Sequence, residues 1–563
     1  MSNAAPLISS PRTRSSALAA MAAEPVDLLI VGGGIVGAAI AREAALRGIR
    51  TALVDQGDFG GATSSGSSRL IHGGLRYLEH GDWRLVREAS RERAVLQRIA
   101  PHLVRPLAFV FPVYRGGRVP AWQLRAGLWA YDLLAGFRNT RLHRWLGPKR
   151  TTRLEPRLRT KGLAGAGLYY DAQTDDARLV LAILRSAAAS GALVANYARA
   201  ASLLKSDGQV RGAGVTDAVT GHTMSVHART VVNATGPWVD QLRRTDDPAA
   251  TPLLRCTKGV HVAVPRARLG HTHAVAFVSP LDGRVMFVLP WGDLSYIGTT
   301  DTDEGAPPED VRATGEDVVY LLRSANALFP DARLAPRDVV ATWAALRPLL
   351  APDRALRPSQ VSREHRVVTA PSGLITIAGG KLTTCRLMGR DVVDRVAERL
   401  RAIDGRPRAP AAPTDRLPLP GGEPHDLEVL VHAATAREIA EPVARHLVAR
   451  YGGEAAAVAN LVERDRKLGE PILAGRPDIW AEVVHAVERE LALRLGDVLI
   501  RRLHLFYEDP GRGLAVAPAV AARMGELLGW DGARREAEVA EYAATVERTR
   551  AFLTEVPRMS RVT

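Results

Sequence analysis

The chain has 563 residues, and its 46% hydrophobic and 24% charged content is typical of a globular protein with two to four domains. No stretch of 18 residues is apolar and free of charge, which argues against a membrane-spanning helix. The two cysteines, Cys256 and Cys385, form no C-x-x-C motif. A disulfide framework or a dithiol flavoreductase is therefore not expected, and a reducing compartment fits.

The formal net charge of +15 favours an anionic partner, which could be a nucleic acid, an anionic lipid or a phosphorylated substrate. Nucleic acid is the weakest of these three, because the basic residues are not gathered in one tail. Nearly all of them are arginines. Among the six lysines, Lys258 and Lys381 stand in glycine-rich motifs, which suggests that a compact ammonium group is needed there.

Residues 1–24 are small, polar and basic, without the apolar run of a secretory signal, so we expect a disordered tail. The apolar run over residues 27–31 is typical of a buried parallel strand. A helix is expected over residues 38–47 and a second strand over residues 50–54. This order of strand, glycine turn, helix and strand is the context in which a dinucleotide-binding site forms.

The turn itself reads G-x-G-x-x-G, and each glycine has a separate task. Gly32 makes the tight turn, Gly34 lets backbone amides approach a pyrophosphate, and Gly37 allows close packing of helix and strand. The helix N-terminus favours the anion. Asp55, at the end of the second strand, is placed to accept the ribose hydroxyls. The pattern predicts a dinucleotide site.

The next stretch, residues 60–78, is too polar and glycine-rich for a strand. A hydroxyl-rich loop directly after the ribose acid suits a cofactor that continues past its pyrophosphate, as FAD does. The candidate cofactor-binding residues of this loop are Thr63, Ser64, Ser65 and Ser68. The alternative is a flexible surface loop, which the clustered His, Arg and Tyr residues make less attractive.

The same stretch closely resembles the aerobic, FAD-dependent glycerol-3-phosphate dehydrogenases. In that family a T-S-S-x-S-S-[KR]-L-I-H-G-G-[LV]-R-Y-L-E run follows the Rossmann opening, and residues 63–79 match it almost throughout. Asp55 stands where the family commonly has Glu. The resemblance covers residues 25–545 and implies FAD as cofactor, glycerol 3-phosphate as substrate and work at a membrane surface.

Residues 82–147 are expected to be helical. Within them, residues 121–134 place Trp122, Leu124, Leu128, Trp129 and Tyr131 mostly on one side of a helix, among several arginines. Aromatic residues beside arginines suit a lipid headgroup boundary, and the resemblance strengthens that interpretation. The alternative is an amphipathic helix packed on its own domain.

Short strands are expected from residue 165 onward, including those of a second, mostly antiparallel sheet over 255–265 and 284–300. In flavoproteins that resemble this chain, an A-T-G turn approaches the cofactor, which places Gly236 and Trp238 at the site. The stretch over 376–384 is a strand, a glycine turn and a helix start, and it adds Gly380 and Leu382 as cofactor contacts.

The expected fold class is α/β: a Rossmann-type FAD-binding domain interleaved with an antiparallel-sheet substrate domain over 25–400. A proline-rich linker over 401–424 and an all-helical C-terminal domain over 425–555 follow. No zinc spacing and no second dinucleotide motif is present in the sequence, so neither a metal nor a nicotinamide cofactor is expected.

A phosphate dianion is best held by guanidinium groups and an ammonium group. The candidates that match the family are Arg76, Arg347, Lys258 and Lys381, with hydroxyl groups from Tyr77 and Thr383. The candidates for the base are His261 and His72, because histidine titrates near neutrality. We favour His261, which lies near Lys258, while His72 sits in the glycine-rich turn. The candidate catalytic residues are His261, His72 and Arg347.

The sequence thus predicts oxidation of sn-glycerol 3-phosphate to dihydroxyacetone phosphate, with hydride transfer to flavin N5 and electrons passed to a membrane quinone. Alternatives are an oxidase that uses oxygen, a basic RNA-binding flavoprotein, and an amino-acid oxidase of the wider superfamily. The expected location is the cytoplasm, peripheral on an anionic membrane surface at the inner face of the cytoplasmic membrane. No nucleic-acid partner is expected, and a homodimer is compatible with the sequence.

Overall fold

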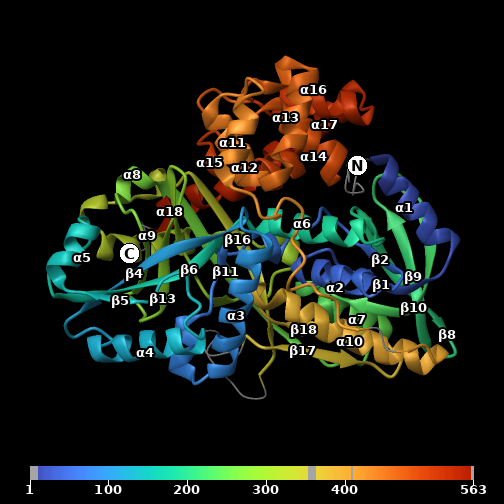
Figure 1. The fold of residues 1–563 in the computed structure, drawn as a ribbon, viewed down its shortest axis with the longest axis horizontal. Coiled ribbons are helices and arrows are strands. Elements are labelled where there is room, and N and C mark those ends of the chain that lie inside the picture. Colours follow the sequence, from blue (N-terminus) through green and yellow to red (C-terminus); the bar gives the residue numbers. More distant parts are fainter. Residues whose placement is uncertain (1–10, 353–362, 408–409, 560–563) are drawn as a thin grey trace.

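The computed structural model describes residues 11–352, 363–407 and 410–559. Two sheets lie side by side, and the helices of the C-terminal part cap one end of the molecule (Figure 1). This is the predicted α/β class, with a Rossmann-type sheet, a mostly antiparallel sheet and a helical C-terminal part.

The first sheet is built on the dinucleotide-type strands. Its order is β17 (His365–Thr369), β18 (Ile375–Gly379), β10 (Thr223–Asn233), β1 (Val26–Val31), β2 (Thr51–Val54) and β7 (Leu193–Ala195). The strands from β18 to β7 pair in parallel. Helices α2 (Ile35–Leu46), α6 (Asp176–Ala189) and α10 (Cys385–Asp404) cover one face, so the apolar run of β1 is buried.

The opposite face of β1 is covered by helix α1 (Pro11–Ala23) and by the antiparallel strands β8 (Ala198–Ser206) and β9 (Gln209–Asp217). Leu18 and Met21 of α1 are buried, and Arg14 forms a buried ion pair of 2.6 Å with Asp217. The expected disordered tail over 1–24 is therefore wrong for residues 11–23. Residues 1–10 lie outside the described part.

The second sheet forms the other half. Its order is β15 (Thr302–Asp303), β11 (Leu254–Pro265), β14 (Leu294–Gly298), β13 (Val285–Trp291), β12 (Ala274–Val278), β4 (Val104–Tyr114), β6 (Leu163–Thr174) and β3 (Leu70–Ile71). Strand β16 (Ala341–Leu350) pairs with β11, and β5 (Arg144–Leu146) pairs with β6. Pairing is antiparallel except between β12 and β4.

Strand β4 corrects the expectation of helix throughout 82–147. Helix α3 (Trp83–Ile99) and helix α4 (Ala121–Leu134) are helical as expected, but β4 between them pairs along its length with β6. Pro106 and Pro112 explain the difference, because a proline inside a helix removes a hydrogen bond and clashes with the preceding turn.

Helix α4 also corrects the predicted apolar face. Leu124, Leu128 and Tyr131 are buried against the sheet, whereas Trp122 and Trp129 are 72% and 61% exposed. The spacing explains this split, because residues seven apart share a helix face and residues two apart lie on opposite sides. The residues predicted to share one side therefore lie on two different faces.

The remaining helices cover the edges of the sheets and form the C-terminal cap. Helices α5 (Pro148–Leu154), α7 (Val239–Asp246), α8 (Arg266–Leu269) and α9 (Gly315–Leu328) precede α10. The cap contains α11 (Leu427–Thr435), α12 (Glu441–Tyr451), α13 (Ala455–Arg464), α14 (Trp480–Glu490), α15 (Leu505–Glu508), α16 (Ala517–Leu528), α17 (Gly532–Arg550) and α18 (Phe552–Met559). Within the described ranges, every helix is too short or too polar to cross a bilayer.

The segment predicted as a linker is packed on the first domain, which consists of the first sheet and the helices that cover it. Helix α10 continues to Asp404, past the expected start at residue 401. Arg42 of α2 donates hydrogen bonds to the carbonyl oxygens of Thr414 (3.0 Å) and Leu417 (2.7 Å). The Thr414 hydroxyl donates to Glu43 at 2.8 Å. Proline stiffens this segment, and these contacts fix its path.

A buried ion cluster joins the C-terminal cap to the first domain. Asp58 follows β2, and its carboxylate accepts two hydrogen bonds from Arg502, of 2.7 and 3.0 Å, and another from Arg501. The Asp58 and Arg502 side chains are both fully buried. A second buried pair, between Arg178 of α6 and Glu490 of α14, lies at 2.7 Å.

Replacing Asp58 with Ala should destabilise the protein by about 3–5 kcal/mol, because it leaves two arginines buried without their shared carboxylate. Urea unfolding followed by circular dichroism would measure the loss. Glu428→Gln is the control, since the Glu428 ion pair with Arg445 on the surface lies in water and contributes little. Equal midpoints for Asp58→Ala and the wild type would contradict the argument.

Candidate active site

A cavity of about 830 Å³ lies between the two sheets. The glycine turn after β1, the hydroxyl-rich loop after β2 and the turn after β10 form one part of its wall. Strands β11 and β16 and the start of α10 form another. Most of the predicted site residues therefore surround one connected space.

The glycine turn is held by close backbone contacts. Gly32 has φ +109°, and a Cβ there would lie 2.5 Å from the carbonyl oxygen of Ala234. A Cβ at Gly37 would lie 1.8 Å from the carbonyl oxygen of Gly32, so only glycine lets α2 pack this closely. The Asp55 carboxylate accepts hydrogen bonds from the amides of Gly33 (2.6 Å) and Gly57 (2.8 Å).

Asp55 lines the cavity and is partly buried. Burial raises the pKa of its carboxyl to about 6, against the lowering effect of the two amide hydrogen bonds. The carboxylate stays charged at neutral pH. It has further acceptor capacity beyond the two amides, so it is able to bind hydroxyl groups in the cavity as predicted.

The hydroxyl-rich loop supplies both lining and support. Ser64 accepts a hydrogen bond of 2.9 Å from the amide of Ile35 at the start of α2, and Thr63 donates one of 2.7 Å to the carbonyl of Leu346. Ser68 lines the cavity. Ser65 is buried and does not line the cavity, so its predicted contact with a cofactor is wrong.

The other predicted cofactor residues lie around the same space. Gly34, Gly236, Trp238, Gly380 and Leu382 all line the cavity. A Cβ on Gly34 would meet only the Ser64 hydroxyl, at 3.1 Å, and one on Gly236 would meet nothing within 4 Å. The backbone is thus open to the cavity at both turns.

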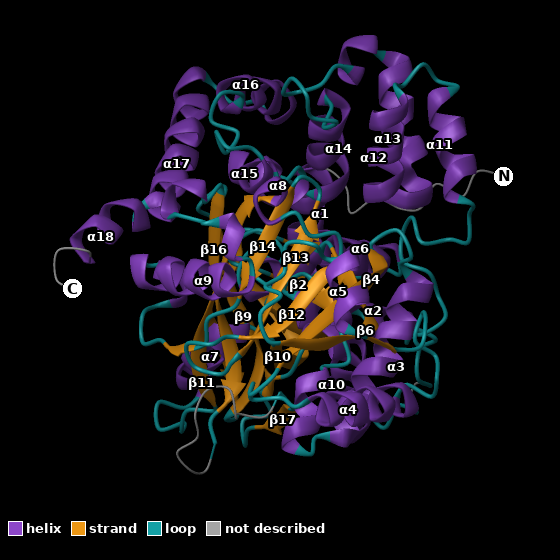
Figure 2. Ribbon diagram, turned by 90° about the vertical axis from the view of Figure 1, so that its left-hand side faces the viewer, coloured by secondary structure: helices purple, strands orange, loops and turns teal. Residues whose placement is uncertain are grey.

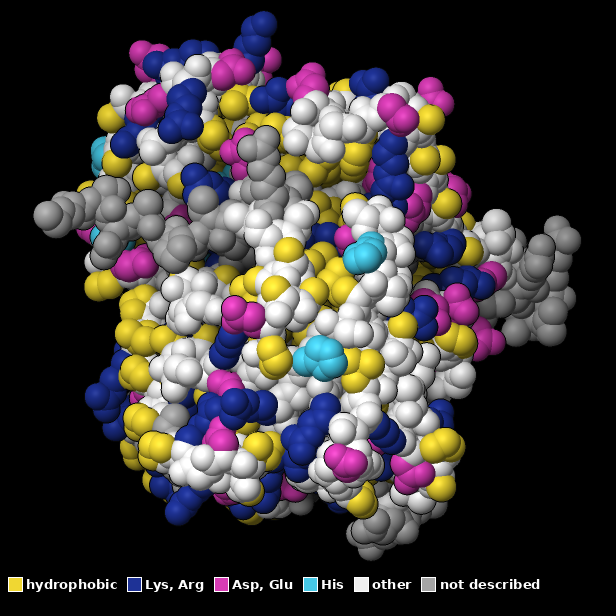
Figure 3. All heavy atoms as spheres, turned by 90° about the vertical axis from the view of Figure 1, so that its right-hand side faces the viewer, with side chains coloured by type: hydrophobic (Ala, Val, Ile, Leu, Met, Phe, Trp, Pro, Cys, Tyr) yellow, Lys and Arg dark blue, Asp and Glu magenta, His cyan; other side chains and the backbone are white. Residues whose placement is uncertain are grey.

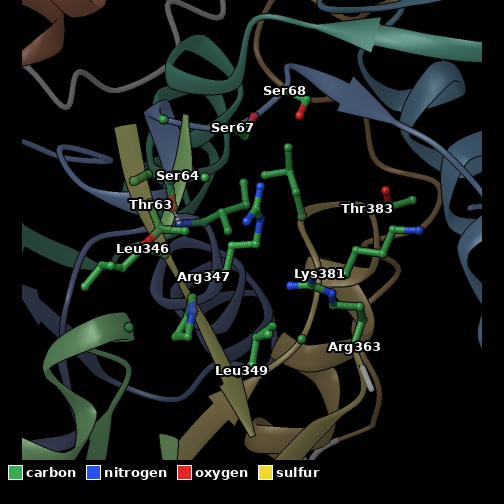
Figure 4. A pocket seen from close by; sticks show the side chains of 18 of the residues that line it. Thr63, Ser64, Ser67, Ser68, Leu346, Arg347, Leu349, Arg363, Lys381 and Thr383 are labelled. Carbon is green, nitrogen blue, oxygen red and sulfur yellow. Dashed lines mark hydrogen bonds between the residues drawn. The ribbon is translucent and has the colours of Figure 1, made fainter. Parts of the chain in front are cut away.

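A group of cations gathers beside β16 and the start of α10. Arg347 and Arg363 lie on facing walls, and Lys381 and Thr383 lie side by side (Figure 4). Arg76 and Tyr77 line the same cavity. This set contains the residues predicted to bind phosphate, except Lys258, together with Arg363.

Arg347 is fixed by several partners. Its guanidinium donates to the Asp301 carboxylate at 3.0 Å, to the Thr299 hydroxyl at 2.6 Å and to the carbonyl of Thr300 at 3.0 Å. Lys381 donates to the carbonyl of His72 at 2.7 Å, and the Thr383 hydroxyl donates to the same carbonyl at 3.3 Å. The cations are therefore held in place before an anion binds.

Mutual repulsion and burial shift the pKa values of this group. Burial and the nearby Arg76 lower the pKa of Lys381 to about 8. Burial opposes ionisation of Tyr77, but the charges of Arg76, Lys381 and Arg363 lower its pKa to about 7. These directions indicate a site with excess positive charge, which a bound anion would relieve.

The two candidate histidines lie in different settings. His261 is buried with its ring stacked on Trp343 at 5.1 Å, and its Nε2 is 2.8 Å from the Ser68 hydroxyl. Burial and the Arg347 charge lower the pKa of His261 to about 3. Burial and Lys381 also lower the pKa of His72 well below its usual value. Both histidines line the cavity and are neutral at pH 7.

Lys258 does not reach the cavity, and its predicted role in substrate binding is wrong. Gly259 and His261 face the cavity, whereas Lys258 lies on the other face of β11 and pairs with Asp317 of α9 at 3.0 Å. Side chains alternate between the two faces of a strand, so residues 258 and 261 cannot share a face.

Several lining residues carried no sequence signal. Arg363 and Arg284 belong to no motif, and Arg501 reaches the cavity from the C-terminal cap. The alternation of β11, where His261 faces the cavity, could have excluded Lys258. Nothing local to residue 363 could have indicated its contact with Asp301, which lies at 3.9 Å.

An apolar wall extends the cavity toward α4. It combines one face of that helix with aromatic residues of the second sheet. The residues are Gln123, Leu124, Ala126, Gly127, Ala130, Phe109, Phe111 and Phe287. The cavity is therefore cationic in one region and apolar in another.

Comparisons with known proteins agree with this geometry. Residues 27–395 match the family model described as FAD dependent oxidoreductase, and residues 412–535 match the C-terminal domain of alpha-glycerophosphate oxidase. An aerobic glycerol-3-phosphate dehydrogenase of Staphylococcus epidermidis is 36% identical over 93% of this chain and 95% of its own length. The chain belongs to the aerobic glycerol-3-phosphate dehydrogenase family.

Solved structures show the same relationship. The glycerol-3-phosphate dehydrogenase of Bacillus halodurans, complexed with FAD, has a TM-score of 0.82 and 31% identity and covers 97% of this chain and 99% of its own. The L-alpha-glycerophosphate oxidase of Mycoplasma pneumoniae has a TM-score of 0.53 at 18% identity, covers 66% of this chain and 94% of its own, and shares the fold.

FAD is the cofactor of this family, and the residues present fit it. The helix α2 N-terminus and the glycine turn offer amides to a pyrophosphate, and Asp55 offers a carboxylate to a ribose. The open backbone at Gly34 and Gly236 leaves room for a bulky group. The hydroxyl-rich loop and the turn at Gly380 line the continuation of the cavity.

Gly34→Val should prevent FAD from binding, because the side chain would occupy the space in front of the helix N-terminus. Flavin absorbance after gel filtration would measure the bound fraction. Gly305→Val is the matched control, since a Cβ at Gly305 meets nothing within 4 Å and the residue does not line the cavity. A full complement of FAD in Gly34→Val would overturn the assignment of the turn.

Proposed function

We propose that the protein oxidises sn-glycerol 3-phosphate to dihydroxyacetone phosphate and passes the electrons to a membrane quinone. The observation that carries the proposal is the cation cluster of Arg76, Arg347, Arg363 and Lys381 beside the cofactor region of one cavity. The names of the family members support the same substrate.

The cluster has the composition expected for a phosphate dianion. Guanidinium forks bind phosphate oxygens in pairs, and an ammonium group adds a point charge. Within the described part of the chain, neither Arg76 nor Lys381 forms an ion pair, so both charges are available to a ligand. A single carboxylate, as in an amino acid, would not need four cations.

The distribution of charge on one face of the molecule favours a small anionic ligand over a polyanion such as nucleic acid. On the face shown in Figure 3, basic and acidic side chains are intermixed, whereas a nucleic-acid site needs a continuous basic surface. Inside the cavity, by contrast, Arg76, Arg347, Arg363 and Lys381 line one space.

The cavity also holds the groups that alcohol oxidation requires. Bound FAD supplies the hydride acceptor. His261 and His72 are neutral and able to accept the hydroxyl proton, although the low pKa of His261 makes it a weak base until a dianion binds nearby. The arginines and Lys381 stabilise the developing alkoxide, which is an electrostatic contribution that does not depend on a strong base.

The pH dependence of kcat/KM tests this substrate. Lys381 is an ammonium group below pH 8 and loses its charge above it, and Tyr77 gains a negative charge above pH 7. Both changes weaken dianion binding, so kcat/KM for glycerol 3-phosphate with a soluble dye should fall as the pH rises from 7 to 9. In Tyr77→Phe, the plot of kcat/KM against pH should keep one descending limb, centred near pH 8, where Lys381 loses its charge.

Adding Lys381→Arg to Tyr77→Phe should remove that limb, because arginine keeps its charge. Glycerol, which has no phosphate, should react slowly and without the limb. A descending limb that survives in the double variant would contradict the role of Lys381, and equal rates with glycerol would contradict phosphate recognition.

The outer face of α4 supports a membrane acceptor. Trp122, Trp129 and Leu133 are 72%, 61% and 64% exposed, and Phe137 and Leu142 in the next segment are also exposed. Exposed arginines lie within α4 or close to it in the sequence: Arg115, Arg118, Arg125, Arg138, Arg141 and Arg144. Apolar side chains insert into a headgroup region and arginines bind anionic lipid, so this patch suits peripheral attachment at the inner face of the cytoplasmic membrane.

The position of α4 relates this patch to the cavity. Figures 1 and 2 both place α4 at the end of the molecule opposite the C-terminal helices. One side of α4 forms part of the wall of the cavity, and an adjacent side carries the exposed tryptophans, since Ala126 of the wall is four residues from Trp122 and three from Trp129. A quinone in the bilayer would then lie close to the apolar region of the cavity.

Replacing Trp122, Trp129 and Leu133 together by Ser should release the protein from vesicles containing phosphatidylglycerol and slow reduction of a long-chain quinone. Dye reduction should remain near normal. Peroxide formation should be slow throughout. Leu427→Ser with Val429→Ser is the control, since these residues of α11 are exposed on the C-terminal cap. A parallel loss of dye and quinone activity would contradict membrane attachment through α4, and fast peroxide formation would favour an oxidase.

A further inference from the structure

Arg69 is a buried cation that does not face the cavity. Its side chain is 1% exposed, and it stands directly after Ser68 in the hydroxyl-rich loop. Its guanidinium donates a hydrogen bond of 2.6 Å to the Tyr296 hydroxyl, and the nearest carboxylate, Asp176, is 3.8 Å away. The Nε of Arg69 has no hydrogen-bond partner within the described ranges.

Four aromatic rings compensate for this sparse polar pairing. The guanidinium carbon lies 4.6 Å from the ring centre of Trp291, 5.1 Å from Tyr296, 5.5 Å from Trp343 and 4.8 Å from Tyr507. A desolvated cation is attracted to the faces of such rings. The aromatic cage therefore holds the charge in place.

One member of the cage comes from the C-terminal part of the chain. Tyr507 belongs to α15, whereas the other three rings belong to β13, β14 and β16. Figures 1 and 2 place α15 where the C-terminal helices meet the second sheet. The edge of Tyr507 also packs against Trp343, with 5.4 Å between the ring centres.

The backbone next to Arg69 is held on both sides. Ser67 donates a hydrogen bond of 2.6 Å to Asp176, and its carbonyl accepts one of 3.2 Å from the Trp343 indole. Arg69 has φ +52°, a left-handed conformation that is unfavourable for a residue with a Cβ. The surroundings fix that conformation: the Arg69 amide donates to the Ser67 hydroxyl at 2.9 Å, the Arg69 carbonyl accepts from the Thr174 amide at 2.9 Å, and the cage holds the side chain.

This arrangement ends at the reaction cavity. Ser68 stands between Ser67 and Arg69 in the chain. It lines the cavity, and its hydroxyl lies 2.8 Å from Nε2 of His261. The ring of His261 stacks on Trp343, itself a member of the cage. Loss of the cage would therefore move both partners of the Ser68–His261 hydrogen bond.

We propose that Tyr507 and Arg69 are positioning residues, through which the C-terminal domain holds the Ser68–His261 pair in place for substrate oxidation. This inference rests on the proposed function, because it assigns His261 to the site where the substrate reacts. It gives the C-terminal domain a part in the reaction through a contact that lies outside the cavity.

The test compares two aromatic residues that are neighbours on α15. Tyr507→Leu removes a ring from the cage, and Phe506→Leu removes the neighbouring ring, which lies outside the cage and packs against Arg512 at 5.3 Å and against Tyr507 at 4.9 Å. Both remove a buried ring that contacts an arginine, so both should lower the thermal midpoint similarly. Tyr507→Phe keeps the ring and should behave as the wild type.

The readout is flavin reduction by glycerol 3-phosphate in a single turnover without oxygen, with each holoenzyme matched for FAD content. Tyr507→Leu should slow the limiting rate on the order of tenfold, since small displacements of reacting groups have effects of this size or larger. The apparent substrate affinity should change little, because the phosphate-binding cations are not in the cage. Phe506→Leu should reduce at the wild-type rate.

A double-mutant cycle separates positioning from general damage. If Tyr507 acts through His261, then Tyr507→Leu should have little further effect in a His261→Gln background. Equal rates in Tyr507→Leu and the wild type, or the same fractional loss in both backgrounds, would overturn the inference. If glycerol 3-phosphate fails to reduce the wild-type flavin, the proposed function itself is wrong, and the two failures are thereby distinguished.

Discussion

The cationic region of the cavity depends on several positive charges being held close together. Arg76, Arg347, Arg363 and Lys381 share one space, and Asp301 is the carboxylate that pairs with two of them. Like charges in a poorly solvated cavity repel, so each cation has to be held by other contacts until an anion arrives. The fixed carbonyls of Thr300 and His72 do this for Arg347 and Lys381.

The arginine-rich composition is used inside the protein as well as on its surface. Arg502 and Arg178 are buried with carboxylates between the first domain and the C-terminal cap, and Arg69 is buried among aromatic rings. A guanidinium group is more weakly hydrated than an ammonium group and stacks on aromatic rings, which makes its burial less costly. The abundance of arginine therefore reflects the interior contacts of the fold as well as its surface.

The sequence alone predicted the features that neighbouring residues in the chain determine. The turn at Gly32 and Gly37 follows from backbone clashes between neighbouring segments, and the helix ends near Gly48 because glycine readily adopts φ +75°. Contacts between distant segments were not predictable in this way. Arg363 reaches Asp301, and Tyr507 reaches Arg69, only after the second sheet and the C-terminal helices have packed. Lys258 is close to His261 in the sequence, but alternation along β11 places its side chain on the other face of the strand.

Helix α4 shows why the split of a helix into two faces bears on function. Leu124 and Leu128 pack on the sheet at Gly167, where a Cβ would lie 2.5 Å from Leu128, so this contact fixes how the helix is rotated about its axis. With that rotation fixed, Trp122 and Trp129 have to point outward. Exposing two tryptophans to water is unfavourable unless another apolar phase covers them. The same packing that closes the apolar wall of the cavity therefore produces the outer face that we propose binds the membrane.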